Sequence, residues 1–360
     1  MDNQYIQRLE RIEVELEKWL PPEPGSAWMD RVFPGLESRV DPALVRSLSE
    51  PGRELLKRGG KRWRPLLMTL VCESLGGREE AVPLAPLVEF SHTASLIHDD
   101  IEDSSGERRG KPAVHLLYGT DRGLNSGSFL YFLSLACIGG WAEKAAGRGA
   151  GPECAGRILA AWGEYMRKLH LGQAMDIHWH RDFSSLPGID EYHTMCALKT
   201  GCLARLAAVL GVCAVPVLED TVRKTAADIL GGAAEKLGVG FQILDDVKNL
   251  TTGIPGKTRG DDVAEGKKSL PVLLYLHRRP DRREFAAECF AAARRDGPEI
   301  PLAGAFIGEL DAAGVLGEAG EQGLSLIRES TEIFSGDVIA GEVLREPGKT
   351  LLGGLAGLIS

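Results

Sequence analysis

The chain has 360 residues, of which 44% are hydrophobic and 26% are charged, proportions that are typical of a globular protein. Its formal net charge of −9, from 42 basic and 51 acidic residues, argues against a protein that binds nucleic acid in general. The seven cysteines include no CxxC pair, so we expect buried, reduced thiols and a cytoplasmic location. Residues 1–20 carry charges throughout, and no uncharged run reaches the roughly 18 residues that a membrane span needs. We therefore expect neither a signal peptide nor a membrane span.

Hydrophobic periodicity predicts helices along the whole chain. Residues 4–20 form an amphipathic pattern, with apolar residues at positions 6, 9, 12, 16 and 20, and prolines follow it. Further helices are predicted over 41–57, 62–76, 81–103, 121–146, 152–179, 189–214, 219–250 and 269–278, and again in the C-terminal third. Segments rich in glycine and proline separate them, and no convincing alternating strand is present. The sequence therefore predicts an all-α fold.

No internal repeat and no shift in composition marks a domain boundary. We expect residues 1–360 to form a single domain, because the candidate chemical residues spread from about 59 to 271. Within it, 1–24 would form an N-terminal helix and a proline-rich linker, 41–278 would carry the motifs, and 281–360 would form capping helices.

Two aspartate-rich segments lie far apart in the sequence, and both follow helical patterns. The first contains Asp99, Asp100 and Asp103, and the second contains Asp245 and Asp246. Residues at i and i+4 share one face of a helix, so Asp99 and Asp103 point the same way. Carboxylates held so close repel one another unless cations lie between them, and Mg²⁺, which shares its oxygen ligands with substrate phosphates, suits them. The pattern indicates a polyphosphate held between two acidic segments.

Basic residues accompany the first aspartate segment on both sides. The run Arg108-Arg109-Gly110-Lys111-Pro112 follows it, and guanidinium groups match phosphate oxygens well. A second cluster lies upstream at Gly59-Gly60-Lys61-Arg62-Trp63-Arg64, where the glycines let the backbone approach a ligand. His92 lies two helical turns before Asp99 and is expected to face the same cavity.

The pair Lys199-Thr200 lies inside an otherwise apolar stretch, and a buried lysine needs an anionic partner. Gln173 and Asp176 lie one turn apart and would add an orienting amide and an oxygen ligand. Lys257 and Lys267 follow the second aspartate segment. Acidic segments with basic neighbours thus occur twice, which indicates a metal-bridged diphosphate.

The motifs GGKRWRP, HTASLIHDDIEDSSGERRGKPAVH, GQAMD, LKTG, FQILDDVKN and EGKKSLP stand in this order within about residues 41–278. In these motifs and their spacing the chain resembles the all-trans polyprenyl diphosphate synthases, and within them the geranylgeranyl diphosphate synthases. The resemblance implies a helical bundle of the isoprenoid synthase type around a central cavity. It also implies a homodimer that packs helix against helix.

The activity implied by the resemblance is head-to-tail prenyl transfer. Isopentenyl diphosphate would condense with an allylic diphosphate to give an all-trans prenyl diphosphate that is longer by one isoprene unit. Mg²⁺, with three ions in each active site, would be the cofactor. Geranylgeranyl diphosphate (C20) is the expected product, and a longer chain of C25–C40 is the alternative.

The matching motifs also imply a role for individual residues. Catalysis would rest on Asp99, Asp100, Asp103, Lys199 and Asp245, and the metal ligands would be Asp99, Asp103, Asp176 and Asp245. The allylic diphosphate would contact Arg108, Lys199, Thr200, Gln242, Lys257 and Lys267, and isopentenyl diphosphate would contact Gly60, Lys61, Arg64, His92 and Arg109. The floor of the product cavity would be Tyr131, Phe132 and His170, because Ser91, Ala94 and Ser95 are too small to block the tail. One departure from the family is Asn249, which ends the second motif in place of aspartate and weakens the expected third metal site.

Two other functions use part of this pattern. A class I terpene cyclase would need the first aspartate segment but no isopentenyl diphosphate site, so Lys61, Arg64 and the second aspartate segment argue against it. A regulatory subunit of a heteromeric synthase would carry degenerate aspartate segments, whereas the first segment here is complete. Catalytic prenyl transfer accounts for both observations.

Overall fold

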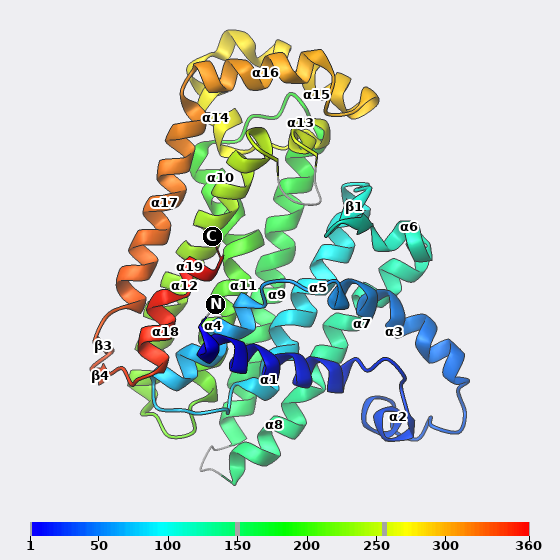
Figure 1. Cartoon of the computed structure of the whole chain (residues 1–360), viewed down its shortest axis with the longest axis vertical. Helices are drawn as coiled ribbons and strands as arrows, with labels where there is room; N and C mark the ends of the chain where they lie inside the picture. The colour runs from blue at the N-terminus through cyan, green and yellow to red at the C-terminus, as the bar shows by residue number, and fades with distance from the viewer. Residues whose placement is uncertain (1, 148–151, 254–257, 360) are drawn as a thin grey trace.

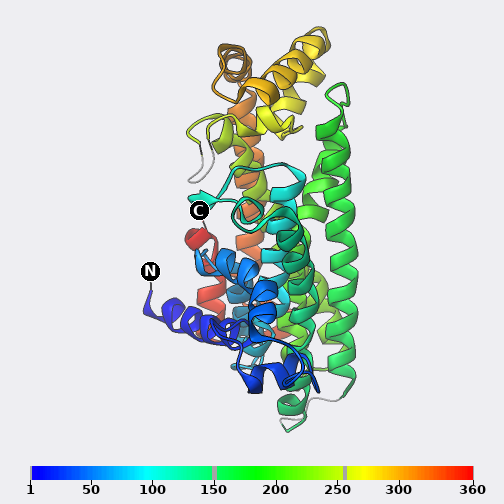
Figure 2. The same cartoon turned by 90° about the vertical axis from the view of Figure 1, so that its right-hand side faces the viewer.

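The computed structural model describes residues 2–147, 152–253 and 258–359, and it confirms the all-α fold (Figure 1). The strands of this described part form two short antiparallel hairpins, in which β1 (Glu107–Arg108) pairs with β2 (Lys111–Pro112) and β3 (Val338–Ile339) with β4 (Glu342–Val343). Seen from the side, the N-terminal helices lie on the lower part of the molecule and the helices around residue 300 lie at its upper end (Figure 2).

The N-terminal elements match the predicted helices closely. They are α1 (Asn3–Trp19), α2 (Ser26–Val32), α3 (Pro42–Lys57), α4 (Trp63–Ser74), the 3₁₀ turn η1 (Val82–Leu84) and α5 (Ala85–Glu102). Capping explains where two of them begin, because the side chains of Asp2 and Asp41 accept the backbone N–H groups of Gln4 and Ala43. The short helix α2 was not predicted.

The central elements include the longest helices. They are α6 (Val114–Tyr118), α7 (Thr120–Leu135), α8 (Cys137–Ala146), α9 (Pro152–Arg181), α10 (Ile189–Cys196), the π-helical turn η2 (Ala197–Gly201), α11 (Cys202–Ala214) and α12 (Asp220–Leu250). The helix predicted over 121–146 is broken at Ala136, and the helix predicted over 189–214 contains the π turn.

The C-terminal elements pack onto the rest of the bundle. They are α13 (Asp261–Glu265), α14 (Leu270–Arg278), the 3₁₀ turn η3 (Pro280–Arg282), α15 (Arg283–Asp296), α16 (Pro301–Ala312), α17 (Val315–Phe334), α18 (Gly348–Gly354) and α19 (Ala356–Ile359). The helix α17 packs along α12, and α18 packs against α4. The chain thus returns to its N-terminal helices at its end (Figure 1).

Glycines bring α9, η2 and α12 unusually close together. A Cβ added to Gly172 of α9 would lie 2.4 Å from the backbone nitrogen of Lys199, and one added to Gly238 of α12 would lie 3.0 Å from the Cα of Gly201. Only glycine permits this approach of backbone to backbone. The buried apolar residues form two clusters, and α12 contributes to both.

All seven cysteines are buried and free, which confirms the prediction of buried thiols. One helical stretch, Ile189–Ala214, is long and apolar enough to cross a membrane, and 67% of its most apolar window is buried inside the protein. Buried core helices meet the same criteria of length and composition, so the expectation of no membrane span stays a prediction.

Candidate active site

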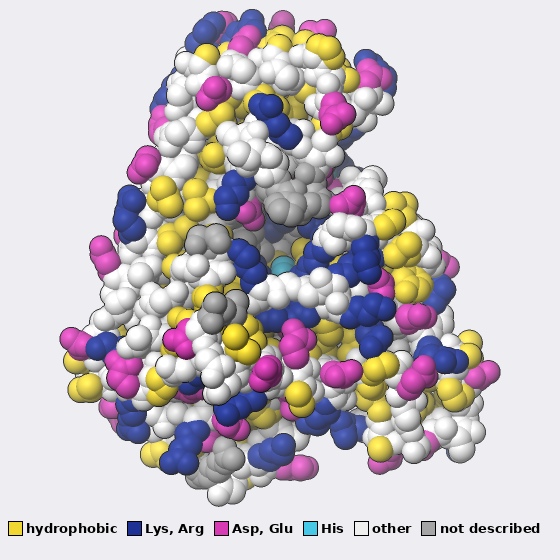
Figure 3. Space-filling view, viewed as in Figure 1, with side chains coloured by type: hydrophobic (Ala, Val, Ile, Leu, Met, Phe, Trp, Pro, Cys, Tyr) yellow, Lys and Arg dark blue, Asp and Glu magenta, His cyan; other side chains and the backbone are white. Residues whose placement is uncertain are grey.

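A cavity of about 650 Å³ lies between α4, α5, α9, α10, η2 and α12. Lys and Arg side chains gather around a hollow in the middle of one face of the molecule (Figure 3). Both aspartate segments and both basic clusters contribute to the cavity wall. The sequence-predicted residues that line it are Gly60, Lys61, Arg64, His92, Asp99, Arg108, Arg109, Gln173, Asp176, Lys199, Thr200, Gln242, Asp245, Asp246 and Lys267.

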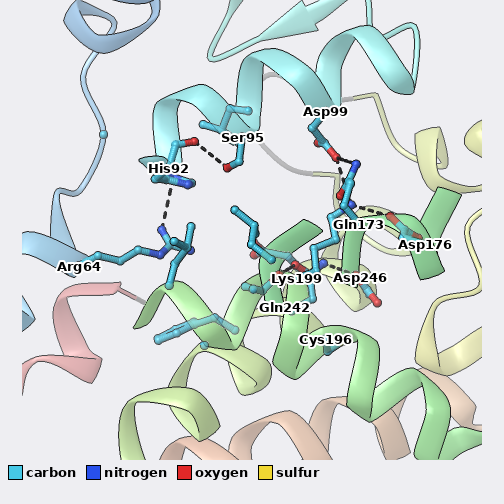
Figure 4. A pocket seen from close by; sticks show the side chains of 18 of the residues that line it. Arg64, His92, Ser95, Asp99, Gln173, Asp176, Cys196, Lys199, Gln242 and Asp246 are labelled. Atoms are coloured by element: carbon cyan, nitrogen blue, oxygen red, sulfur yellow. Dashed lines mark hydrogen bonds and ion pairs between the residues drawn. The ribbon is translucent and has the colours of Figure 1, made fainter. Parts of the chain in front are cut away.

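Asp99, in the last turn of α5, is the centre of a charged network (Figure 4). Its Oδ1 accepts hydrogen bonds from Lys199 Nζ at 3.1 Å and from Gln173 Nε2 at 3.0 Å. Its Oδ2 accepts a hydrogen bond from Arg108 at 3.2 Å. The neighbouring Asp100 is fully buried, and its Oδ1 accepts a hydrogen bond from Arg108 Nε at 2.7 Å. Asp100 therefore holds the arginine in place and does not line the cavity.

Asp103 ends α5 and has a side chain that is only 1% exposed. Neither of its carboxylate oxygens receives a hydrogen bond, although Lys267 Nζ lies 3.3 Å from Oδ2 and His180 Nδ1 lies 3.8 Å from Oδ1. Burial raises the pKa of Asp103, and the charge of Lys267 opposes this rise. Asp103 lines a second pocket with Glu102. A cation at these buried oxygens would compensate the carboxylate, so the residue fits a magnesium site.

Basic side chains stand between the predicted metal ligands. Lys199 Nζ lies 3.1 Å from Asp99 Oδ1 and 2.5 Å from Asp176 Oδ2, and Lys267 lies beside Asp103. In the described part of the chain, no three carboxylate, imidazole or thiol groups converge on one point. The oxygen-only donor set suits Mg²⁺, which would compete with these lysines for the carboxylates.

The two aspartates of the second segment have different surroundings. Both line the cavity, but Asp245 is exposed whereas Asp246 is buried. The Tyr192 hydroxyl donates to Oδ2 of Asp246 at 2.7 Å, and Gln242 Nε2 donates to Oδ1 at 2.8 Å. Burial and the nearby charge of Asp262 raise the pKa of Asp246 to about 7. Asp246 thus belongs to the cavity wall, and Asp245 is left to face the ligand space.

The π turn η2 presents Lys199 and Thr200 to the cavity. Such turns with i→i+5 bonds interrupt an α-helix and are frequent at functional sites. Burial alone would lower the pKa of Lys199, but the carboxylates of Asp176 and Asp99 outweigh it and raise the pKa. Thr200 Oγ1 donates to Gln242 Oε1 at 2.8 Å. The half-buried Lys199 has the anionic partner that we expected from the sequence. A metal-binding role for Asp176 stays a prediction.

Asn249 does not line the cavity. It is 1% exposed, and its Oδ1 accepts the backbone N–H of Asp262 at 3.2 Å. This bond ties the end of α12 to the start of α13, and Asp262 itself lines the cavity. The side chain at position 249 therefore holds the loop that brings a further carboxylate to the site.

The upstream basic cluster depends on a left-handed backbone. Gly60 has φ +149°, and a Cβ there would lie 3.1 Å from Arg109 Nη2, so the glycine makes room for this guanidinium. Arg109 donates to the carbonyl oxygen of Gly59, and Lys61 Nζ donates to the carbonyl oxygen of Ile359 in α19. The end of the chain therefore reaches the predicted isopentenyl diphosphate site.

Arg64 and His92 meet across the cavity wall, with Arg64 Nη1 3.3 Å from His92 Nε2 (Figure 4). Burial lowers the pKa of Arg64 to about 10, so it keeps its charge at neutral pH. Burial together with Arg64 and Arg109 lowers the pKa of His92 well below its usual value. His92 is thus a neutral ring among cations.

The predicted cavity floor is only partly assembled. Tyr131 is buried, and its ring centroid lies 5.5 Å from that of His170. Neither residue lines the cavity, whose apolar wall includes Leu96, Leu169 and Leu203. Phe132 is 69% exposed, which corrects the expectation that it belongs to the floor of its own chain. Consecutive helical residues point about 100° apart, so only one of the pair can face inward.

Three contributors to the site were missed from the sequence, and one predicted residue cannot be placed. Tyr192 lies two helical turns before Lys199, a spacing that could have indicated it. Asp262 and Ile359 carry no local signal, because loops and chain packing bring them to the cavity. Lys257 lies outside the described residues.

The chain matches known proteins over most of its length. Residues 45–301 match the family model named polyprenyl synthetase. The geranylgeranyl pyrophosphate synthase of Eremothecium gossypii is 36% identical over 233 residues, which are 63% of this chain and 68% of that protein. The geranylfarnesyl diphosphate synthase of Aeropyrum pernix is 34% identical over 243 residues, 66% of this chain and 73% of that protein.

Solved structures share the fold. A crystal structure of a geranylgeranyl pyrophosphate synthase superposes with a TM-score of 0.78 at 21% identity and covers 100% of this chain and 99% of that one. The geranylgeranyl pyrophosphate synthase of Corynebacterium glutamicum, solved in complex with isoprenyl diphosphate and magnesium, superposes with a TM-score of 0.75 at 20% identity. The match covers 96% of this chain and 97% of that one. These likenesses confirm the helical bundle of the isoprenoid synthase type. Since the family model spans more than half of the sequence, the chain belongs to the polyprenyl synthetase family and is a trans-prenyltransferase that elongates prenyl diphosphates.

Proposed function

We propose that the protein makes geranylgeranyl diphosphate by Mg²⁺-dependent condensation of isopentenyl diphosphate with an allylic diphosphate. The observation that carries this proposal is the single cavity whose wall combines two aspartate segments with two separate basic clusters. Two basic clusters match two diphosphate groups, and the aspartates match the cations between them. A terpene cyclase would leave the cluster at Lys61 and Arg64 without a ligand.

In this reaction the chain's own residues bind and orient two substrates. Arg108, Lys199 and Lys267 would hold the allylic diphosphate, and Mg²⁺ bound by the aspartates would neutralise the charge that grows as the C1–O bond breaks. Lys61, Arg64 and Arg109 would hold isopentenyl diphosphate, with neutral His92 beside Arg64. The double bond of isopentenyl diphosphate attacks C1 of the allyl cation. Loss of a proton to the departing diphosphate then gives the longer allylic diphosphate.

The wall behind the first aspartates supports a long tail. Ser95 and Leu96 line the cavity one turn before Asp99, and Ser91 is a small buried residue a further turn away. The two similar proteins described above carry names for C20 and C25 products. We infer a C20 product, with C25 as the second candidate.

We also infer a homodimer. Leu124 and Phe132 lie two turns apart on α7 and are 50% and 69% exposed, and hydrophobic side chains gather on the surface over α6 (Figure 3). A second copy of the chain would remove this apolar surface from water. We further place the protein in the cytoplasm, because its buried free thiols need no oxidising compartment.

A direct assay tests the proposed function. Purified protein should convert isopentenyl diphosphate and farnesyl or geranyl diphosphate to C20 diphosphate only when Mg²⁺ is present. Asp99→Asn should lower turnover about 100-fold or more, because the network around the first segment loses its charge, while the helical circular dichroism stays unchanged. Wild-type protein that consumes the allylic diphosphate without incorporating isopentenyl diphosphate would contradict the proposal and favour a cyclase.

A further inference from the structure

One carboxylate of the second aspartate segment is fixed by a tyrosine that lies outside every aspartate or basic motif. Tyr192 of α10 is 1% exposed, and its hydroxyl donates to Asp246 Oδ2 at 2.7 Å. Gln242 Nε2 donates to the other oxygen of Asp246 at 2.8 Å (Figure 4). Each oxygen of this carboxylate is thus occupied by an uncharged donor.

The same contacts continue to the diphosphate-binding residues. With its amide nitrogen turned to Asp246, Gln242 presents its oxygen to Thr200, whose hydroxyl donates to it at 2.8 Å. Four side chains therefore join α10, α12 and the π turn η2 in the order Tyr192, Asp246, Gln242, Thr200. All four line the cavity, although Tyr192 and Asp246 are buried.

We propose that Tyr192 is a positioning residue for prenyl transfer, because its hydroxyl holds Asp246 in the orientation that directs Gln242 and Thr200 toward the allylic diphosphate. This inference rests on the function proposed above. A buried carboxylate that loses one of two donors seeks a new partner. Here the alternatives are cations, either Lys267, whose charge acts on Asp246, or a metal ion that Asp245 would bind. Asp246 would then compete with Asp245 for the metal ion, and Gln242 would lose its hydrogen bond to Asp246.

Tyr192→Phe removes only the hydroxyl and tests this role. The variant should lose about tenfold in kcat with the allylic substrate, while the KM for isopentenyl diphosphate stays within twofold, since that site lies on other residues. Tyr275→Phe is a matched control, because Tyr275 is also buried and also donates to a carboxylate, that of Glu309, away from the cavity. It should leave both constants unchanged. Equal kinetics of Tyr192→Phe and wild type, or equal losses in both tyrosine variants, would overturn the proposal.

A second comparison keeps the proposal testable if Tyr192→Phe folds poorly. In an Asp246→Asn background the neutral amide no longer needs the tyrosine, so the added Tyr192→Phe change should cost less than twofold in kcat. A further tenfold loss in the double variant would show that Tyr192 acts by another route and would overturn the proposal.

Metal binding gives a readout that does not depend on turnover. Mn²⁺ titrated into the protein with inorganic diphosphate, and followed by electron paramagnetic resonance, should bind Tyr192→Phe at least threefold more weakly than Tyr275→Phe. Equal binding curves would contradict the proposed competition between Asp246 and Asp245. An inactive wild type would refute the proposed function instead, and this titration distinguishes the two failures.

Discussion

At the scale of single residues, burial and neighbouring charges together determine the pKa values in the site. His92 shows this most clearly, because it is half-buried beside Arg64 and the charge of Arg109 also acts on it. A protonated ring there would add a cation to a cluster that already lacks solvent. The pKa of His92 is therefore lowered, and its ring can accept a hydrogen bond from Arg64 while the arginine keeps its charge for a phosphate.

The lowered pKa of His92 has a consequence for stability at low pH. Below about pH 6.5 the unfolded chain binds a proton at this histidine and the folded chain does not, so the free energy of unfolding falls as the pH falls. The loss should approach about 1.4 kcal/mol per pH unit. His92→Gln should remove it. Urea unfolding of wild type and His92→Gln at pH 7, 6 and 5 checks this prediction. The contributions of the other histidines cancel in the difference, because both proteins contain them. Parallel pH curves for the two proteins would refute the assignment.

At the scale of elements, the close approach of α9 to η2 decides where Lys199 lies. Gly172 has no space for a side chain, since a Cβ would lie 2.4 Å from the nitrogen of Lys199 and 2.7 Å from the carbonyl carbon of Leu198. Both neighbours are backbone atoms of the π turn. They can move away only if the turn itself moves, and with it the lysine that joins Asp99 to Asp176.

Gly172→Ala should therefore damage both stability and catalysis. Overpacking of this kind costs about 1–3 kcal/mol, and displacement of Lys199 should raise the KM for the allylic substrate. Gly156→Ala is the control in the same helix, because a Cβ there meets nothing within 4 Å, and it should stabilise the fold by about 0.5–1 kcal/mol. Denaturant unfolding separates the two. Similar stabilities of both variants would show that η2 adapts to the added methyl group.

The sequence predicted most helices because apolar residues recur with the helical period, as in α3 and α12. The breaks within helices were harder to predict. The π turn at Ala197–Gly201 adds one residue to a turn without changing the apolar composition, and the break at Ala136 has neither proline nor glycine beside it. Tertiary packing determines where both of these breaks occur, so no local sequence pattern predicts them. The π turn matters most, because it carries Lys199 and Thr200.

At the scale of the whole molecule, complementary chemistry predicted which distant segments would meet. Asp99, Lys199 and Asp245 carry opposite charges within otherwise apolar helical segments, so their convergence on one charged ligand was foreseeable. Residues that reach the cavity through loops or chain ends could not be predicted from the sequence in this way. Ile359 contributes only a carbonyl oxygen to Lys61, a group that every residue possesses. Packing, not residue type, brings it there.

The adjacent residues Tyr131 and Phe132 allow product length and self-association to be separated. Tyr131 is buried between the rings of His98 and His170, at 5.6 and 5.5 Å, whereas Phe132 points outward. Tyr131→Ala should open space beside the first aspartate helix and lengthen the product beyond that of wild type, because a large aromatic side chain is lost from the interior. Phe132→Glu should leave product length unchanged. It should instead weaken the dimer, because it places a charge on the exposed apolar face.

Chromatography of the prenyl products and light scattering of the two variants check these outcomes separately. Wild-type protein that is already monomeric at micromolar concentration would contradict the homodimer. A longer product from Phe132→Glu, with none from Tyr131→Ala, would mean that the outward residue closes the product cavity of a neighbouring chain. The cavity would then be completed by the dimer and not by the single bundle, since within one chain the side chain of Phe132 cannot turn inward without displacing Tyr131 from its place between the two histidines.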